Sequence, residues 1–239
     1  MTNKLHNYFT GSALAPALAP ALAPALALAA LLSCSVGSAQ AEITFYNSQA
    51  AYLAAISAQA VDRFDDLPFW AQGPGYVERT AGEHRYVAWS VAEEGEDSLL
   101  YSAGSGSDAW LSTDKASDYL TFGYFSDKVN AVGGFFFGTD ANGAYLPGQT
   151  IRLNVLDADG VEELILVDNT APGSFFGFVS SSRLEAFQVS TVQPIGGASW
   201  VAANDLTLGS IAAVPEPSSY ALLLSGLGLV GAAARRRKV

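Results

Sequence analysis

Two pairs of oxygen-donor side chains in this sequence could bind a metal ion. Asp65 and Asp66 are adjacent in one segment, and Asn204 and Asp205 are adjacent in another, far along the chain. Calcium binds hard oxygen donors of this kind. The first and last strands of a β-sandwich often lie side by side, which would bring the two pairs together. The sequence therefore predicts a structural calcium ion at Asp65, Asp66, Asn204 and Asp205.

Residues for nucleophilic or transition-metal catalysis are scarce. The chain has two histidines, and only His84 lies outside the N-terminal export segment described below. No Gly-x-Ser-x-Gly motif marks a nucleophile elbow, and His84 with its neighbours is interpreted as an exposed loop. Cys34 is the only cysteine and lies in the export segment, so multi-histidine and cysteine-ligated zinc or iron sites are excluded. We therefore expect the protein to be non-catalytic.

The acidic cluster at residues 93–97 has the functional groups of a glycosidase in an unsuitable arrangement. It reads Glu-Glu-Gly-Glu-Asp, whereas glycoside hydrolysis needs two carboxyl groups about 5 to 9 Å apart across a groove. Carboxylates crowded into one polar segment repel each other and stay hydrated. We interpret the cluster as a solvated loop, and a polysaccharide-active enzyme stays the least favoured alternative.

Aromatic residues offer a different kind of chemistry, the stacking of sugar rings. Trp70 follows Phe69 and precedes a Gly-Pro-Gly-Tyr segment that ends at Tyr76. Exposed aromatic rings present an apolar face to a ligand while their polar edges stay in water. The sequence therefore makes Trp70 and Tyr76 candidate carbohydrate contacts, and Trp200, which opens an apolar segment, a core residue.

The elements that would position these residues are mainly strands. A first strand at residues 43–46 is followed by a helix that Asn47 or Ser48 can cap and that runs from residue 50 to about residue 60. Short segments rich in aromatic and β-branched residues follow, and a turn at residues 157–160 predicts a hairpin. This pattern predicts a single β-sandwich of jelly-roll type with one short N-terminal helix. The predicted later strands are residues 86–91, 119–125, 129–138, 151–155, 161–167, 175–179, 184–191 and 200–208.

The charge of this region excludes one class of partner. Residues 42–213 hold seven Lys and Arg against 22 Asp and Glu, a net charge of −15. A surface this negative repels phosphate backbones, so nucleic acid is not an expected partner. The charge suits a solvated extracellular domain.

The N-terminus has the features of a cleavable signal peptide. Lys4 precedes a long stretch of Ala, Leu and Pro, and Ala39 and Ala41 form the small-x-small pattern that signal peptidase cleaves. We place the signal peptide at residues 1–41, with cleavage after Ala41. Leu31-Leu32-Ser33-Cys34 loosely resembles a lipoprotein box, which leaves lipidation of Cys34 as an alternative.

The C-terminal segment, residues 214–239, combines three features in a fixed order. The triplet Pro215-Glu216-Pro217 comes first, and residues 217–234 carry no formal charge. At about 1.5 Å per residue, a helix of this length nearly spans a hydrocarbon core of roughly 30 Å. Arg235, Arg236, Arg237 and Lys238 follow directly and favour the cytoplasmic side of the inner membrane. The segment predicts a transmembrane helix with a stop-transfer cluster.

This order of parts resembles the PEP-CTERM sorting signal of Gram-negative bacteria. In that family an exosortase, a membrane cysteine transpeptidase, recognises the triplet and removes the tail, and the members accompany exopolysaccharide and biofilm production. Residues 175–178 (Phe-Phe-Gly-Phe) and 204–209 (Asn-Asp-Leu-Thr-Leu-Gly) are also loosely similar to strands of the β-sandwich domains in such proteins. The resemblance implies signal peptidase and exosortase as processing partners, and a transient membrane anchor before release.

Together these features predict an exported, non-catalytic protein of the cell surface or of the extracellular polysaccharide matrix of a biofilm. The alternative is a carbohydrate-binding module proper. Gly226, Gly228 and Gly231 make the tail a weak permanent anchor, as expected of a segment that is held briefly and then removed.

Overall fold

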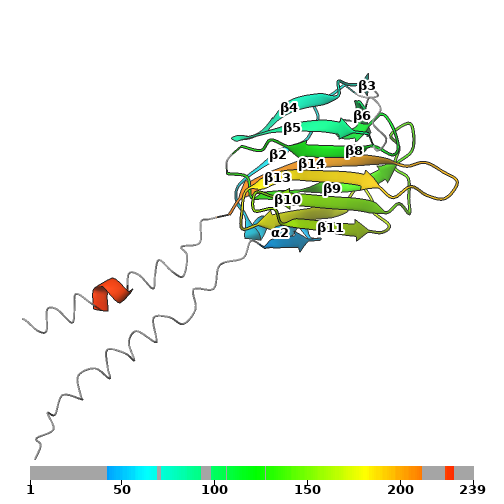
Figure 1. Cartoon of the computed structure of the whole chain (residues 1–239). Coiled ribbons are helices and arrows are strands. Elements are labelled where there is room, and N and C mark those ends of the chain that lie inside the picture. The colour runs from blue at the N-terminus through cyan, green and yellow to red at the C-terminus, as the bar shows by residue number, and fades with distance from the viewer. Residues whose placement is uncertain are drawn as a thin grey trace, which may run out of the picture. The chain divides into compact units, whose positions relative to one another are not determined.

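The computed structural model describes residues 42–68, 71–92, 98–105, 107–126, 128–211 and 224–228. Residues 42–211 within this set form two antiparallel sheets packed face to face (Figure 1). The predicted mainly β, sandwich-like fold with few helices is confirmed. Residues 224–228 are helical.

The first sheet has eight strands in the order β1-β12-β9-β14-β7-β6-β3, with β2 also paired to β14. The second sheet has six strands in the order β11-β10-β13-β8-β5-β4. Strands far apart in sequence therefore lie side by side in both sheets. The bounds in the first sheet are β1 Ile43–Tyr46, β2 Ser57–Asp62, β3 Ala71–Gln72, β6 Leu100–Ser105, β7 Asp108–Thr113, β9 Ala131–Thr139, β12 Phe175–Ser180 and β14 Trp200–Ser210. Those in the second are β4 Tyr76–Ala81, β5 His84–Val91, β8 Tyr119–Gly123, β10 Ile151–Asp157, β11 Glu162–Val167 and β13 Leu184–Thr191.

Strand β10 shows how the sequence pattern produces the sandwich. Its apolar residues Ile151, Leu153 and Val155 are fully buried, whereas Arg152 and Asn154 between them lie on the outer face. This is the period of two that places alternate side chains on opposite faces of a sheet. The predicted hairpin to β11 is confirmed, because Ile151 to Leu156 pair antiparallel with β11.

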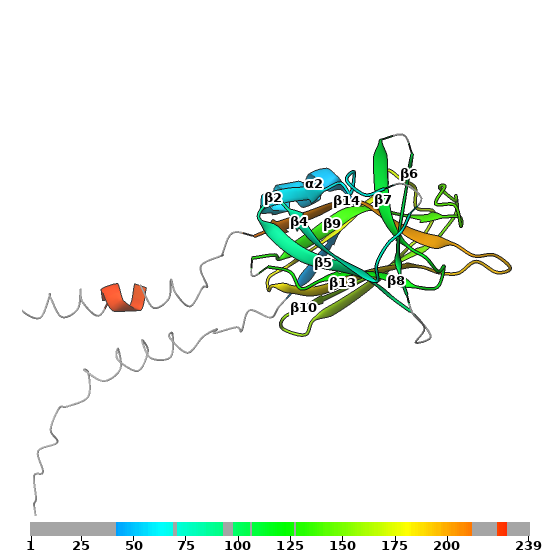
Figure 2. The ribbon, with the colours of Figure 1, turned by 90° about the horizontal axis from the view of Figure 1, so that it is seen from above.

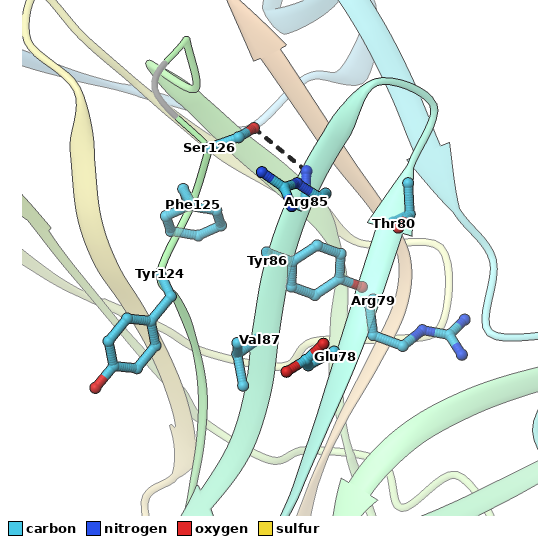
Figure 3. A pocket seen from close by; sticks show the side chains of 9 residues that line it. All are labelled: Glu78, Arg79, Thr80, Arg85, Tyr86, Val87, Tyr124, Phe125 and Ser126. Carbon is cyan, nitrogen blue, oxygen red and sulfur yellow. Dashed lines mark hydrogen bonds between the residues drawn. The ribbon is translucent and has the colours of Figure 1, made fainter.

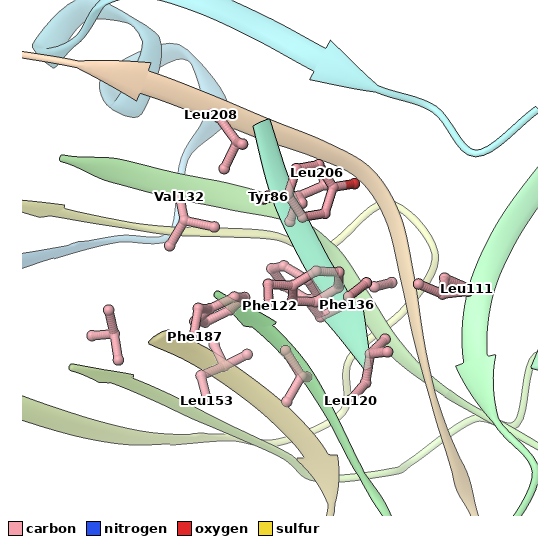
Figure 4. Packing of buried hydrophobic residues seen from close by; sticks show 14 of the residues in the cluster. Tyr86, Leu111, Leu120, Phe122, Val132, Phe136, Leu153, Phe187, Leu206 and Leu208 are labelled. Atoms are coloured by element: carbon pink, nitrogen blue, oxygen red, sulfur yellow. The ribbon is translucent and has the colours of Figure 1, made fainter. Parts of the chain in front are cut away.

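The core between the sheets is largely aromatic (Figure 4). Phe187 lies at its centre, with ring centroids 6.1 Å from Phe122, 5.2 Å from Phe136 and 5.8 Å from Phe178. Two of these rings come from one sheet and two from the other, so the contacts hold the sheets together. Stacked, tilted and edge-to-face pairs of this kind contribute about 0.5–1.5 kcal/mol each beyond the area that they bury.

The predicted helix is real but shorter than expected. Helix α2 spans Gln49–Ala55, with Ser48 as its N-cap, and it packs its buried Tyr52 against Phe175 of the eight-stranded sheet. Figure 2 shows the helix beside β2 of that sheet. The prediction that it runs to about residue 60 is wrong. Residues 57–62 instead form β2, because the chain turns into extended backbone at Ile56 and pairs with β14.

Candidate functional site

Three aromatic residues gather on the outer face of the six-stranded sheet. Tyr76 on β4 and Trp89 on β5 are direct register partners, and both side chains point away from the core. Tyr124 follows directly after β8, the next strand along the sheet. Cross-strand partners on one face have Cβ atoms about 4.5–5.5 Å apart, so the sheet itself brings the rings together. We call Tyr76, Trp89 and Tyr124 the aromatic platform.

The platform is open to solvent. Tyr76 is 63% exposed and Tyr124 is 79% exposed, whereas Trp89 is half-buried. The ring centroids of Trp89 and Tyr124 lie 5.6 Å apart with planes at 48°. Together with Val87 and Gly75, the three residues line a shallow pocket of about 530 Å³. An apolar hollow of this size on the surface is suited to the flat face of a ligand.

Two features of the backbone hold the platform in place. Tyr124 has φ 51°, a left-handed backbone conformation that is unfavourable for a residue other than glycine. Its ring is exposed, so burial of the ring does not offset this energy. Gly123 before it leaves room for the indole of Trp89, since a Cβ there would lie 2.8 Å from Trp89 Cη2. Local strain of this kind is found at ligand sites, where it fixes a side chain in advance of binding.

A more polar pocket of about 590 Å³ adjoins the platform and shares Val87 and Tyr124 with it. Glu78 and Thr80 on β4 and Arg85 on β5 contribute hydrogen-bonding groups to its wall (Figure 3). The Arg85 backbone N–H donates to Ser126 Oγ at 3.2 Å, which ties β5 to the segment after Tyr124. Apolar rings beside a few polar groups are the usual composition of a small-ligand site.

The described groups in these two pockets are suited to binding a ligand. Glu78 is the only carboxylate among the described residues that line them. Stacking on the platform and hydrogen bonds from the polar wall are what this arrangement can provide.

The sequence identified one member of the platform. Tyr76 is exposed as expected but opens strand β4 instead of lying in a loop, and Trp70 lies outside the described residues. Trp89 and Tyr124 were missed. The alternation in β5, in which Tyr86, Ala88 and Ser90 are buried and Trp89 takes an outer position, is the signal that could have placed Trp89 on the surface.

His84 does not lie in an exposed loop, so that interpretation was wrong. It is the first residue of β5 and only 5% exposed, with Nε2 2.7 Å from the carbonyl oxygen of Ala58. This contact lies at the β4–β5 hairpin, whose strands pair through Ala81 and His84. The imidazole thus joins the hairpin to strand β2. Among the described residues, His84 is separate from the aromatic platform.

Three of the four predicted calcium ligands come together in the structure. Asn204 Nδ2 donates to Asp108 Oδ1 at 2.9 Å, and the backbone N–H of Ala109 donates to Asp65 Oδ1 at 3.4 Å. Asp205 follows Asn204 in left-handed backbone, with φ 50°. Burial raises the pKa of Asp205, and the nearby charges of Asp108 and Asp65 raise it further, against the opposing effect of Arg63. Sequence reasoning missed Asp108.

Asp66 takes a different partner. It accepts hydrogen bonds from Arg79 Nη1 at 2.8 Å and Nη2 at 2.7 Å, and these bonds hold the pKa of its carboxyl below the usual value. Among the residues described by the structure, no group of three or more His, Cys, Asp or Glu is arranged to hold a metal ion. The calcium ion stays a prediction. Of its four predicted ligands, Asp65, Asn204 and Asp205 lie near one another, and Asp66 binds Arg79 instead.

Thermal melting in calcium and in EDTA tests the calcium prediction. We expect the protein to melt about 5 to 10 °C higher with calcium at a hundred times its Kd. Because the pKa of Asp205 is raised on folding, its ionised form destabilises the folded protein at neutral pH and this penalty disappears as the pH falls. Asp205→Asn should therefore melt above the wild type in EDTA and lose the response to calcium. Identical melting of the wild type in both solutions would rule the ion out.

The predicted processing residues lie outside the described part of the chain. These are Ala39 and Ala41, Pro215, Glu216 and Pro217, and the cluster Arg235, Arg236, Arg237 and Lys238. The acidic cluster at residues 93–97 and Cys34 also lie outside it. Within the described residues no helix is both long and apolar enough to cross a membrane.

Comparison with known families decides the nature of the tail. The model of the PEP-CTERM protein-sorting motif matches residues 213–238. The chain carries a PEP-CTERM sorting signal. The resemblance inferred from the triplet, the uncharged stretch and the basic cluster is thereby confirmed. A comparison with curated proteins finds no significant match.

Solved structures similar to the chain include carbohydrate-binding modules. The CBM22-1–GH10 modules of Clostridium thermocellum xylanase 10B align with 13% identity and a TM-score of 0.33, over 66% of this chain and 29% of that one. The CBM22-1–CBM22-2 tandem domain of Paenibacillus barcinonensis Xyn10C gives 13% and 0.32, over 66% and 46%. TmCBM61 in complex with β-1,4-galactotriose gives 15% and 0.29, over 54% and 89%. The chain thus spans less than half of the first two structures.

Proposed function

We propose that this is an exported, exosortase-processed protein of the cell surface or biofilm matrix, which binds extracellular polysaccharide without catalysis. The observation that carries the binding function is the aromatic platform. Tyr76, Trp89 and Tyr124 present rings to solvent, and Tyr124 does so from a strained backbone. Rings held outward at such a cost are explained by a ligand that stacks on them.

Export and sorting complete the proposal. Residues 1–41 act as a signal peptide that signal peptidase cleaves after Ala41. The PEP-CTERM signal then holds the chain in the inner membrane through a transmembrane helix, with Arg235 to Lys238 as the stop-transfer cluster, until an exosortase removes the tail. The domain released outside is a jelly-roll β-sandwich with a net charge of −15 over residues 42–213. A strongly charged surface keeps such a domain soluble outside the cell.

The binding function is tested with the exported protein and the extracellular polysaccharide of the producing cells. In affinity electrophoresis, we expect the protein to be retarded in gels that contain the polysaccharide and not in gels without it. A glycan array then identifies the sugar. Equal mobility in both gels, together with no signal on the array, would contradict carbohydrate binding. Release of reducing ends or unsaturated sugars would instead favour a polysaccharide-active enzyme.

Sorting is tested by Pro215→Ala. The two prolines around Glu216 keep the triplet in extended backbone, a form that a processing enzyme can bind. We expect the variant to accumulate in the membrane fraction at its unprocessed mass, while the wild type is found outside the cell. Ser218→Ala, just beyond the triplet, serves as the control and should be processed normally. Normal processing and location of the Pro215 variant would contradict the sorting role of the triplet.

A further inference from the structure

The aromatic platform occupies one end of a row of side chains that crosses the whole six-stranded sheet. The strand register makes each member of the row the direct partner of the next, and all of them lie on the outer face, where Thr121 in the middle of the row is only 1% exposed. Neighbouring strands are about 4.8 Å apart, so the row is about 24 Å long. Its members, from β4 to β11, are Tyr76, Trp89, Thr121, Gln188, Asn154 and Leu164.

A second pocket, of about 420 Å³, lies at the far end of this row. Two polar atoms that line it, Ser190 Oγ and Asn154 Oδ1, are buried without a hydrogen-bond partner. Ser190 is only 3% exposed. Buried polar atoms are nearly always hydrogen-bonded, and leaving one unpaired costs about 1–3 kcal/mol. A ligand in the pocket would supply the missing partners.

Arg152 brings a positive charge to this pocket, and no carboxylate of the described residues forms an ion pair with it. Its Nη1 donates to the Tyr119 hydroxyl at 3.2 Å, and among the described residues no carboxylate lies within ion-pair distance of it. Arg79 and Arg183, by contrast, both form ion pairs. Among the described residues Arg85, in the polar pocket beside the platform, likewise has no ion pair, so Arg152 is one of two arginines whose guanidinium is free to bind an anion. Its planar fork of donors matches a carboxylate.

We infer that the far pocket is a second sugar subsite, and that it takes a carboxylate-bearing unit of a polysaccharide chain lying along the row. Arg152 binds the carboxylate, Ser190 and Asn154 bind hydroxyl groups, and Leu164 and Leu166 border the ring. Both leucines are more than half exposed, at 53% and 56%. This inference rests on the proposed carbohydrate binding, and it names an acidic polysaccharide as the ligand class.

The negative charge of the domain opposes this ligand only at long range. At physiological ionic strength charges separated by more than about 8 Å are largely screened. The direct contact between guanidinium and carboxylate is screened much less. The contact therefore determines the preference for the acidic form, and the net charge affects mainly the rate of association.

The test compares the native extracellular polysaccharide with the same material after its carboxyl groups have been reduced to alcohols. We expect the wild type to bind the native form about tenfold more tightly, as a hydrogen-bonded charge pair allows. Arg152→Gln should remove this preference. Arg183→Gln removes the same charge from an arginine that is paired with Glu185, so it should keep the preference. Fragments too short to reach from the platform to the far pocket should bind wild type and Arg152→Gln equally.

The outcomes separate the two hypotheses. Binding of both polysaccharide forms with equal affinity, or a preference that persists in Arg152→Gln, would overturn the acidic subsite and leave the platform standing. Failure of the wild type to bind either form would overturn the proposed function itself. Thermal melting of Arg152→Gln should match the wild type, because Arg152 lies on the outer face and its one side-chain hydrogen bond among the described residues is to Tyr119.

Discussion

Replacing Trp89 with alanine is expected to weaken polysaccharide binding by about 30-fold or more and to leave the fold intact. Aromatic residues at the centre of an interface cost about 2 kcal/mol or more when truncated, and 1.4 kcal/mol is a factor of ten in Kd. Trp89 is the central member of the platform, since it is paired with Tyr76 across the strands and lies 5.6 Å from the ring of Tyr124. Isothermal titration with the polysaccharide measures the loss.

A matched control separates ring stacking from general damage. Tyr145→Ala removes a tyrosine that is 39% exposed and packs edge-to-face on Phe137 of the other sheet, so it should bind as the wild type does. Gly123→Ala keeps every ring but places a Cβ 2.8 Å from Trp89 Cη2, which must move the indole. It should therefore lose part of the affinity. Wild-type affinity in Trp89→Ala would refute the platform as the binding site.

The fold could be predicted where the sequence carries a clear period. Strand β13 matches the predicted bounds of residues 184–191, and β10 shows the predicted alternation of buried and outer residues. Strand β2 was assigned to the helix because its sequence, Ser-Ala-Gln-Ala-Val-Asp, has a single β-branched residue. It is extended because β14 offers an edge to pair with, so tertiary context overrides local preference.

The site was only partly predictable, because no single segment of the sequence specifies which strands pair or in which register. Tyr76 and Trp89 meet through the β4–β5 hairpin, and Tyr124 reaches them through β8 pairing with β5. The calcium hypothesis shows the same limit. Asp65 lies near Asp205 because β2 pairs with β14, whereas the first strand, β1, pairs with β12 and not with the last strand as the prediction assumed. Adjacent Asp66 turns instead toward Arg79, a partner that no spacing rule indicated.

The largest loss of stability is expected at Asp62, and Asp66 supplies its matched control. Both carboxylates bind Arg79 Nη2, at 2.6 Å and 2.7 Å, yet the Asp62 side chain is 5% exposed and that of Asp66 is 69% exposed. Removing the buried partner of an ion pair costs up to about 3–5 kcal/mol, and less where a second carboxylate, here Asp66, still binds the guanidinium; an exposed pair contributes about 1 kcal/mol or less. Urea unfolding should therefore show a large loss for Asp62→Ala and a small one for Asp66→Ala.

The pH dependence of the Asp66 variant follows from its pKa. Hydrogen bonds from Arg79 lower the pKa of Asp66 on folding, so the ionised carboxyl stabilises the folded protein. This contribution is complete above the unfolded value of about 3.9 and is lost as the pH falls through the lower folded value. Asp66→Ala should thus differ from the wild type at pH 7 and converge with it in strong acid.

Asp62 matters more because it joins the two sheets. It ends β2 in the eight-stranded sheet, while Arg79 and Tyr86 come from β4 and β5 of the other. Tyr86 donates its hydroxyl to Asp62 Oδ2 at 2.8 Å, and burial together with this carboxylate raises the pKa of Tyr86. Tyr86→Phe removes only that hydrogen bond and should cost less stability than Asp62→Ala.

Equal losses of stability in Asp62→Ala and Asp66→Ala would mean that burial does not determine the strength of these ion pairs. Because Arg79 lies three residues from Tyr76 on β4, the same network anchors the strand that carries the edge of the platform.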